Sequence, residues 1–224
     1  MWSVDCIEGP GVAEIHSLEY TPVPWSEQAG GLDPRVRFTF ADGFLPTTVH
    51  DLGAADDVSG DDVPDLVLAF GQQAVVRSGA TGKVVLPVPV PGGFSLSVAG
   101  VGDLDGDGRG ELLVGSPGED VGIWFDAGRA RVYSGLDGSL MYGYEGADDF
   151  DRLGSEVAAV GDADADGTPD FAIQVRRNGG SLQDVLVVSG LDGTVLHTIP
   201  APIGFQDFGN RIAGVGDVDD DGHD

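Results

Sequence analysis

The sequence has little positive charge, one cysteine and no long apolar run. Only 11 lysine and arginine residues stand against 38 aspartate and glutamate residues, so the formal net charge is −27. This imbalance argues against nucleic acid as a partner, because the phosphates would be repelled. The single cysteine, Cys6, excludes a disulfide within the chain. Apolar runs such as Leu66–Phe70 are only strand-sized, so we expect no membrane insertion.

The sequence also lacks the signs of a helix or of an export signal. No segment shows a sustained apolar period of 3.6 residues, and residues 1–20 lack the basic and apolar regions of a signal peptide. Glycine, by contrast, is abundant at 37 residues, and 41% of residues are apolar. Such a composition is typical of a packed core with many tight turns. The missing 3.6-residue period predicts an all-β chain almost without helix.

An acidic segment recurs along the chain. DVSGDDVPDLVLAF begins at Asp57, DLDGDGRGELLVGS at Asp103, DADADGTPDFAIQV at Asp162 and DVDDDGHD at Asp217. Similar leads precede the loops, as in FDRLGSEVAAVGD and FQDFGNRIAGVGD, and each complete loop is followed by an apolar pair of segments around SGATG or SGLDG. A repeat of about 50 residues is typical of propellers and solenoids.

Each repeat reads as four antiparallel strands, so we predict β-propeller blades. The first strand is Val98–Gly102 or its equivalent, and the second, such as Glu111–Gly115, is apolar throughout, as in a strand covered on both faces. The last two flank the Asp-Gly or Thr-Gly turn, a hairpin signal. Because the last motif breaks off at Asp224, we expect a piece of a larger, about seven-bladed propeller. The predicted units are an N-terminal segment that we interpret as the tail of a preceding blade (1–46), three blades (47–92, 93–146 and 147–202) and the start of another (203–224).

The acidic loop follows the pattern D-x-D-x-D-G-x-x-[DE], which predicts a Ca²⁺ site. Alternate carboxylates on a tight loop can converge on one point, glycine at position 6 permits the bend, and the acid at position 9 can close the shell as a bidentate ligand. The carbonyl at position 7 is expected to add an oxygen. The predicted ligands are Asp57, Ser59, Asp61 and Asp65; Asp103, Asp105, Asp107, Arg109 and Glu111; Asp162, Asp164, Asp166, Thr168 and Asp170; and Asp217, Asp219 and Asp221.

Two other readings of the loop are weighed against calcium. An EF-hand or dockerin loop needs a helix and an acid at position 12, but Leu68, Val114 and Ile173 stand there. The alternative of an Asp/Gly-rich turn that binds no ion is left open, although four copies of the loop argue against it. In the first loop Asp62 replaces the glycine, so we expect a weaker or differently shaped site.

These residues resemble the FG-GAP repeat of integrin α-subunit propellers and bacterial surface proteins. The resemblance covers roughly residues 50–224; Phe208-Gly209 matches the FG element and Gly115-Ser116-Pro117 the GAP element, whereas other units depart from it, with Phe94-Ser95 for FG. The resemblance implies a calcium-stabilised propeller used for adhesion or extracellular recognition of a protein or polysaccharide, at the cell surface or secreted.

No catalytic motif is visible in the sequence. The four histidines are far apart, and neither G-x-S-x-G nor a Walker A loop occurs. The leading hypothesis is therefore a non-enzymatic, calcium-binding module. The alternatives are the propeller part of a polysaccharide lyase or hydrolase whose active site lies outside this chain, and a structural spacer.

Overall fold

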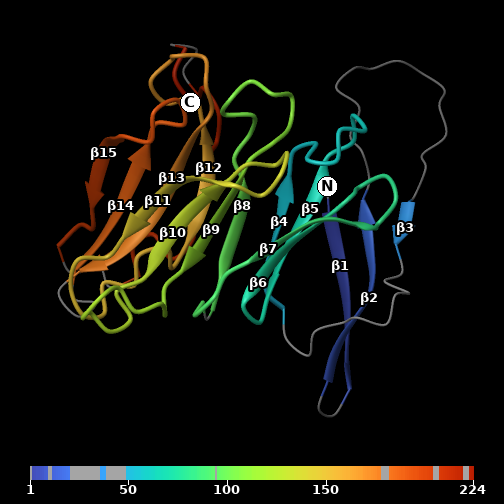
Figure 1. The fold of residues 1–224 in the computed structure, drawn as a ribbon, viewed down its shortest axis with the longest axis horizontal. Coiled ribbons are helices and arrows are strands. Elements are labelled where there is room, and N and C mark those ends of the chain that lie inside the picture. Colours follow the sequence, from blue (N-terminus) through green and yellow to red (C-terminus); the bar gives the residue numbers. More distant parts are fainter. Residues whose placement is uncertain are drawn as a thin grey trace.

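The computed structural model describes residues 2–9, 12–20, 36–38, 49–93, 95–177, 182–203, 207–218 and 222–224. These residues form fifteen strands and no helix (Figure 1). No described helix is long and apolar enough to cross a bilayer. The predicted all-β class is confirmed.

Twelve of the strands form three sheets of four antiparallel strands, each in simple up-and-down order. Consecutive strands pair because short turns join them, with glycine at positive φ in the Thr-Gly and Asp-Gly links. The strands of the first sheet are β4 (Val49–Ala55), β5 (Asp65–Phe70), β6 (Gln73–Arg77) and β7 (Val84–Pro89). Those of the second are β8 (Ser97–Gly100), β9 (Leu112–Ser116), β10 (Arg129–Tyr133) and β11 (Leu140–Glu145). Those of the third are β12 (Val157–Gly161), β13 (Asp170–Arg177), β14 (Leu182–Val188) and β15 (Val195–Pro200).

The first strands of the three sheets lie next to one another. Strand β8 contacts both β4 and β12. This approach requires small residues, because a Cβ on Gly100 would lie 2.5 Å from the Cα of Ala55, and one on Gly53 would lie 2.9 Å from the carbonyl oxygen of Val98. Sheets that meet through their first strands and stack face to face are propeller blades, as predicted.

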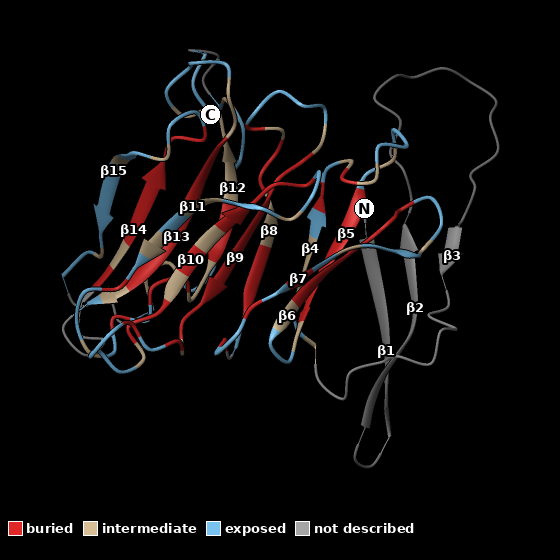
Figure 2. Cartoon of the chain, in the orientation of Figure 1, coloured by how far each residue is buried: buried red, intermediate tan, exposed pale blue. Residues whose placement is uncertain are grey.

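The core lies between the blades. Along β9, Leu112 and Val114 pack into the cluster shared with the first blade, whereas Leu113 packs into the cluster shared with the third. Because side chains alternate along a strand, a strand covered on both faces must be apolar at every position. Phe171 and Ile173 on β13 are likewise fully buried. Figure 2 shows the second and third strands largely buried, with the fourth strands β7, β11 and β15 more exposed.

A further sheet precedes the blades. Strands β1 (Trp2–Gly9), β2 (Val12–Tyr20) and β3 (Val36–Phe38) pair in that order, antiparallel. The sequence predicted no strand at β1 or β2, since residues 2–20 repeat nothing found later in the chain. The division of the chain at the residues given above stays a prediction.

Candidate metal-binding loops

Three complete acidic loops join the first and second strands of the three blades, at the upper edge in Figure 1. The aspartate at position 1 organises each loop by accepting backbone N–H groups from within positions 4 to 6. Asp103 accepts from Gly106 at 2.8 Å, from Asp107 at 3.2 Å and from Gly108 at 2.8 Å. Asp57 does the same in the first loop, and Asp162 accepts from positions 5 and 6 in the third. The loop geometry is therefore fixed by its own first carboxylate.

The tight bend depends on backbone conformations at positive φ. Gly108 and Gly167, at position 6, have φ values of 87° and 93°, and no atom other than chain neighbours lies within 4 Å of the place where a Cβ would be. Asp62 adopts the same region with φ 63° although it carries a side chain. The first loop thus keeps a positive φ at position 6 with an aspartate in place of glycine, and its weaker or differently shaped ion site stays a prediction.

Carboxylate oxygens converge in each of these loops. In every group, one oxygen from each member lies within 4.8 Å of the others. The members at positions 3 and 5 are exposed, whereas the acid at position 9 is buried where it takes part. The groups are Asp57, Asp61 and Asp65; Asp103, Asp105, Asp107 and Glu111; and Asp162, Asp164 and Asp166. Asp170 is not brought into the third group.

The acid at position 9 is fully buried and held on both oxygens. Glu111 accepts the N–H of Leu104 on Oε2 at 2.5 Å and that of Gly135 on Oε1 at 3.3 Å. Asp170 accepts in the same way from Ala163 at 2.8 Å and Gly190 at 2.9 Å. Asp65 repeats the arrangement with Val58 and Gly79 as donors. In Glu111 and Asp170 each carboxylate oxygen keeps a further lone pair for a cation, whereas Asp65 Oδ2 also accepts the N–H of Ser59.

The glycine of the Ser-Gly pair is a site residue that sequence reasoning missed. Beyond donating its N–H to the buried acid, it touches the carbonyl of position 8. A Cβ on Gly79, Gly135 or Gly190 would lie 1.9, 2.2 or 1.9 Å from the carbonyl oxygen of the residue before the acid. The sequence does contain a signal, since SG recurs at 78–79, 134–135 and 189–190, but the repeat alone indicates only a hairpin.

The clustered acids perturb one another. Burial raises the pKa of Glu111 to about 7, with the charges of Asp105 and Asp103 adding to the rise against two hydrogen bonds that lower it. Burial likewise raises the pKa of Asp65 and Asp170. For Asp57 burial alone would raise the pKa, but the N–H groups of three following residues hold it below its ordinary value. A bound cation would relieve this repulsion.

The remaining predicted ligands differ from loop to loop in the hydrogen bonds that they make. The N–H groups of Arg109 and Thr168 donate to Asp107 and Asp166, and the guanidinium of Arg109 donates to Val58 of the neighbouring blade. The Ser59 hydroxyl lies 3.3 Å from carboxylates of both Asp57 and Asp65. In the last loop Asp217 accepts the N–H of Gly222, whereas Asp219 and Asp221 lie outside the described residues.

The donor set suits Ca²⁺. It consists of carboxylate oxygens on a tight loop, with a serine hydroxyl in the first, and such hard oxygen ligands select Ca²⁺ or Mg²⁺ over zinc and copper. In the second loop Asp103, Asp105, Asp107 and Glu111 supply four carboxylates. Among the described ion pairs, none joins a lysine or arginine to these carboxylates. The residues present therefore fit a divalent cation.

Comparison with known proteins agrees with the repeat. The family model described as FG-GAP repeat matches residues 95–133, which run from the start of the second blade to the end of β10. Integrin alpha-4 of Xenopus laevis is 30% identical over 133 residues, covering 54% of this chain and 13% of that protein. Integrin alpha-IIb of Homo sapiens is 32% identical over 151 residues, covering 58% and 14%. The chain thus spans about a seventh of the length of these relatives.

Solved structures give a weaker likeness. Rhamnogalacturonan lyase YesW has a TM-score of 0.44 at 19% identity, over 93% of this chain and 42% of that one. The Bacillus licheniformis rhamnogalacturonan lyase PL11 has a TM-score of 0.46 at 18% identity, with the same coverage. These values carry no argument about function. The repeat, the blades and the sequence matches together support an FG-GAP, integrin-alpha-like repeat protein, with the FG-GAP model matching residues 95–133.

Proposed function

We propose that this chain is a non-enzymatic recognition module in which Ca²⁺ stabilises the acidic loops between the first and second strands of each blade. The module would serve cell adhesion or the binding of an extracellular protein or polysaccharide. The observation that carries the proposal is the convergence of three or four carboxylates within 4.8 Å in three successive loops, without a described lysine or arginine paired to them. Repulsion of this kind, repeated in each blade, favours a cation that the chain does not supply.

In this proposal each residue type has its own task. Asp103 shapes its loop by holding three N–H groups. Asp105 and Asp107 present exposed carboxylates, and Glu111 anchors the site to the blade. Ca²⁺ would neutralise these charges and tie the first turn of the blade to the hairpin that carries Gly135. The recognition surface would then be held in one shape.

The extracellular setting and the partners are part of the proposal. Integrin alpha subunits supply the family likeness, and millimolar calcium, as found outside cells, suits loops of modest affinity. The net charge of −27 disfavours nucleic acid as a partner. No described observation favours a catalytic role.

The test is a calcium titration by calorimetry, with the melting temperature measured in calcium and in EDTA. At a free Ca²⁺ concentration tenfold above Kd, each occupied site stabilises the fold by about 1.4 kcal/mol. Replacement of Asp105 or Asp164 by alanine is expected to remove one site. Asp137→Ala is the matched control, because this exposed aspartate caps a hairpin turn at Ser139 and lies outside the loops. Absence of binding heat and of any melting shift would refute the proposal.

A further inference from the structure

Two adjoining cavities lie at the end of the blades opposite the acidic loops. Their volumes are about 520 Å³ and about 490 Å³. Both are lined by Ser95 and Ser155, just before the first strands of the second and third blades, and by Arg176 near the end of β13. The acidic loops follow the opposite ends of those first strands. The cavities are therefore separate from the candidate metal sites.

The smaller cavity carries an excess of positive charge. Arg152 and Arg176 line it against a single carboxylate, that of Asp126. Arg152 and Asp126 approach only to 3.8 Å, and both side chains are partly exposed. Two guanidinium groups gathered in one cavity are unexpected in a chain that has 11 basic residues and a net charge of −27. The local charge is suited to an anionic group.

Arg176 occupies the boundary between the cavities without a carboxylate partner among the described residues. One guanidinium nitrogen donates to Asn210 Oδ1 at 2.9 Å, and its buried Nε has no hydrogen-bond partner. Two residues earlier on the same face of β13, the fully buried Gln174 leaves its Oε1 without a partner. A charged donor held in this way is positioned by the fold and keeps hydrogen-bonding capacity.

Backbone strain is concentrated around the smaller cavity. Among the described residues, six that are not glycine have positive φ, and two of them, Asp62 and Ala165, belong to the acidic loops. The other four are Ser95 at 54°, Asp126 at 48°, Phe150 at 62° and Arg152 at 46°. Three of these four line the cavity, and Phe150 is two residues from Arg152. Such strain persists where the surrounding structure enforces it, and it gathers at functional sites.

Apolar side chains are exposed on the two connections that carry the lining residues Asp126 and Arg152. The loop from the second to the third strand of a blade is long only in the second blade, where it joins β9 to β10. This loop exposes the side chains of Ile123 (79%), Trp124 (36%) and Phe125 (65%). Phe150, in the connection to the third blade, is 45% exposed, and its N–H donates to the Phe125 carbonyl at 2.8 Å. The two connections are further joined by the N–H of Arg152, which donates to the Asp126 carbonyl at 3.1 Å. The rings are thus linked to the cavity lining through the backbone.

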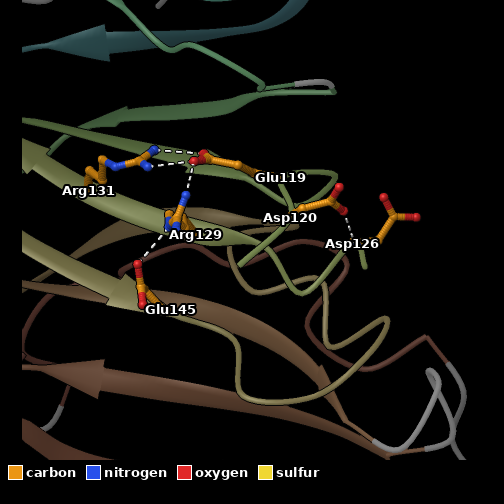
Figure 3. A network of polar contacts seen from close by, with 6 residues as sticks. All are labelled: Glu119, Asp120, Asp126, Arg129, Arg131 and Glu145. Carbon is orange, nitrogen blue, oxygen red and sulfur yellow. Dashed lines mark hydrogen bonds and ion pairs between the residues drawn. The ribbon is translucent and has the colours of Figure 1, made fainter. Parts of the chain in front are cut away.

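An ion-pair network around the buried Glu119 holds the long loop in place (Figure 3). Glu119 bonds to Arg129 and, at 2.7 and 2.8 Å, to Arg131. Asp120 accepts the N–H of Asp126 at 2.9 Å across the base of the loop. A loop fixed in this way loses little conformational entropy on binding, which favours a binding role for its exposed rings.

We propose that these cavities bind an acidic saccharide, with Arg176 and Arg152 receiving the carboxylate of a uronic acid and the exposed rings stacking on the sugar. Carboxylate binding by paired guanidiniums is bidentate and geometrically selective. The larger cavity offers acceptors for sugar hydroxyls on Asp51, Glu156 and Asn210. A sugar can donate its hydroxyls to these acceptors, whereas the ionised side chains of an acidic peptide have no hydrogen to donate. The inference deepens the recognition part of the proposed function and rests on it for context.

The test is a calorimetric titration of the whole chain, in calcium, with tri-galacturonate and tri-mannuronate, and with the methyl ester of each. We expect saturable binding of at least one acid form and binding weaker by about tenfold or more for its ester, since a hydrogen bond to a charged group is worth that much. Arg176→Gln and the more exposed Arg152→Gln are each expected to weaken binding of the acid form by about tenfold. Phe150→Ala is expected to weaken the acid and the ester alike.

Arg177→Gln is the matched control, because Arg177 follows Arg176 on β13, pairs with Asp184 at 2.9 Å and lines neither cavity. It is expected to leave saccharide binding unchanged. Equal binding of acid and ester, no binding of any probe, or tighter binding of an Asp/Glu hexapeptide would overturn the inference. Calcium titrated in the same sample separates the two proposals: calcium binding without saccharide binding refutes only the saccharide site.

Discussion

Replacement of Gly135 by alanine is expected to destabilise the second blade and its acidic loop together. A Cβ at this position would lie 2.2 Å from the carbonyl oxygen of Gly110, a backbone atom that cannot rotate away. To reach ordinary contact, the turn or the loop must shift by about 1 Å, and forced shifts of this kind cost about 1–3 kcal/mol. The same shift lengthens the hydrogen bond from Gly135 N–H to Glu111, which is 3.3 Å.

In a chain of this size a loss of 1 kcal/mol lowers the melting temperature by about 2–4 °C, so we expect a decrease of about 2–12 °C. Thermal unfolding in calcium and in EDTA measures it. Gly143→Ala is the control, because Gly143 lies on β11 with no other atom within 4 Å of its Cβ position. Its melting temperature is expected to be unchanged or slightly higher. If the two variants melt alike, the inferred contact between the turn and the loop is wrong.

Three further outcomes are expected. Asp105→Ala should lower the number of calcium ions bound by one, as measured by calorimetry. The free energy of unfolding should be higher in calcium than in EDTA, and in this variant that difference should be smaller by about 1.4 kcal/mol at a tenfold excess of calcium over Kd. Burial would raise the pKa of Glu119, but Arg131 and Arg129 hold it below 4.5; its contribution is therefore present above pH 4.5 and lost as pH falls through the folded pKa. In urea unfolding, the stability difference between wild type and Glu119→Gln should accordingly be full near neutrality and shrink under acid, and a constant difference would contradict the assignment. Ser97→Ala should cost about 1 kcal/mol, because the buried Ser97 hydroxyl donates to the Gly154 carbonyl of the third blade at 2.9 Å.

The sequence predicted the parts of the molecule that repeat. Strand β9 is apolar at every position because Leu112 and Leu113 face different blades, and this pattern is local enough to be recognised in the sequence. The start of β9 was predicted at Glu111 and lies at Leu112, although Glu111 still exchanges backbone hydrogen bonds with Val101 and Gly102. The contact of the Glu111 carboxylate with the N–H of Gly135 was not predicted. Such a contact joins residues 24 positions apart, so no short pattern contains it.

The parts that do not repeat were not predicted. The loop between β9 and β10 contains Glu119, whose partners Arg129 and Arg131 stand ten and twelve residues later, and nothing in one copy marks the three as a network. The sequence also gives no sign of the positive φ of Phe150 and Arg152, because the neighbouring loop imposes their backbone conformation through hydrogen bonds. The candidate saccharide site lies where the repeat is interrupted, and the candidate metal-binding loops lie where it is regular.

The glycine that closes each acidic loop also sets the order in which a blade can be completed. The buried acid lies on the second strand, and its donor lies 14, 24 or 20 residues later, beyond the third strand. A loop cannot reach its final geometry until that hairpin has formed, so its affinity for an ion would report the folding of three strands at once. Amide exchange at Gly135 should therefore match exchange in β9 and β10, and faster exchange at Gly135 alone would refute this. On a nascent chain, calcium would then bind only to blades whose first three strands have already formed.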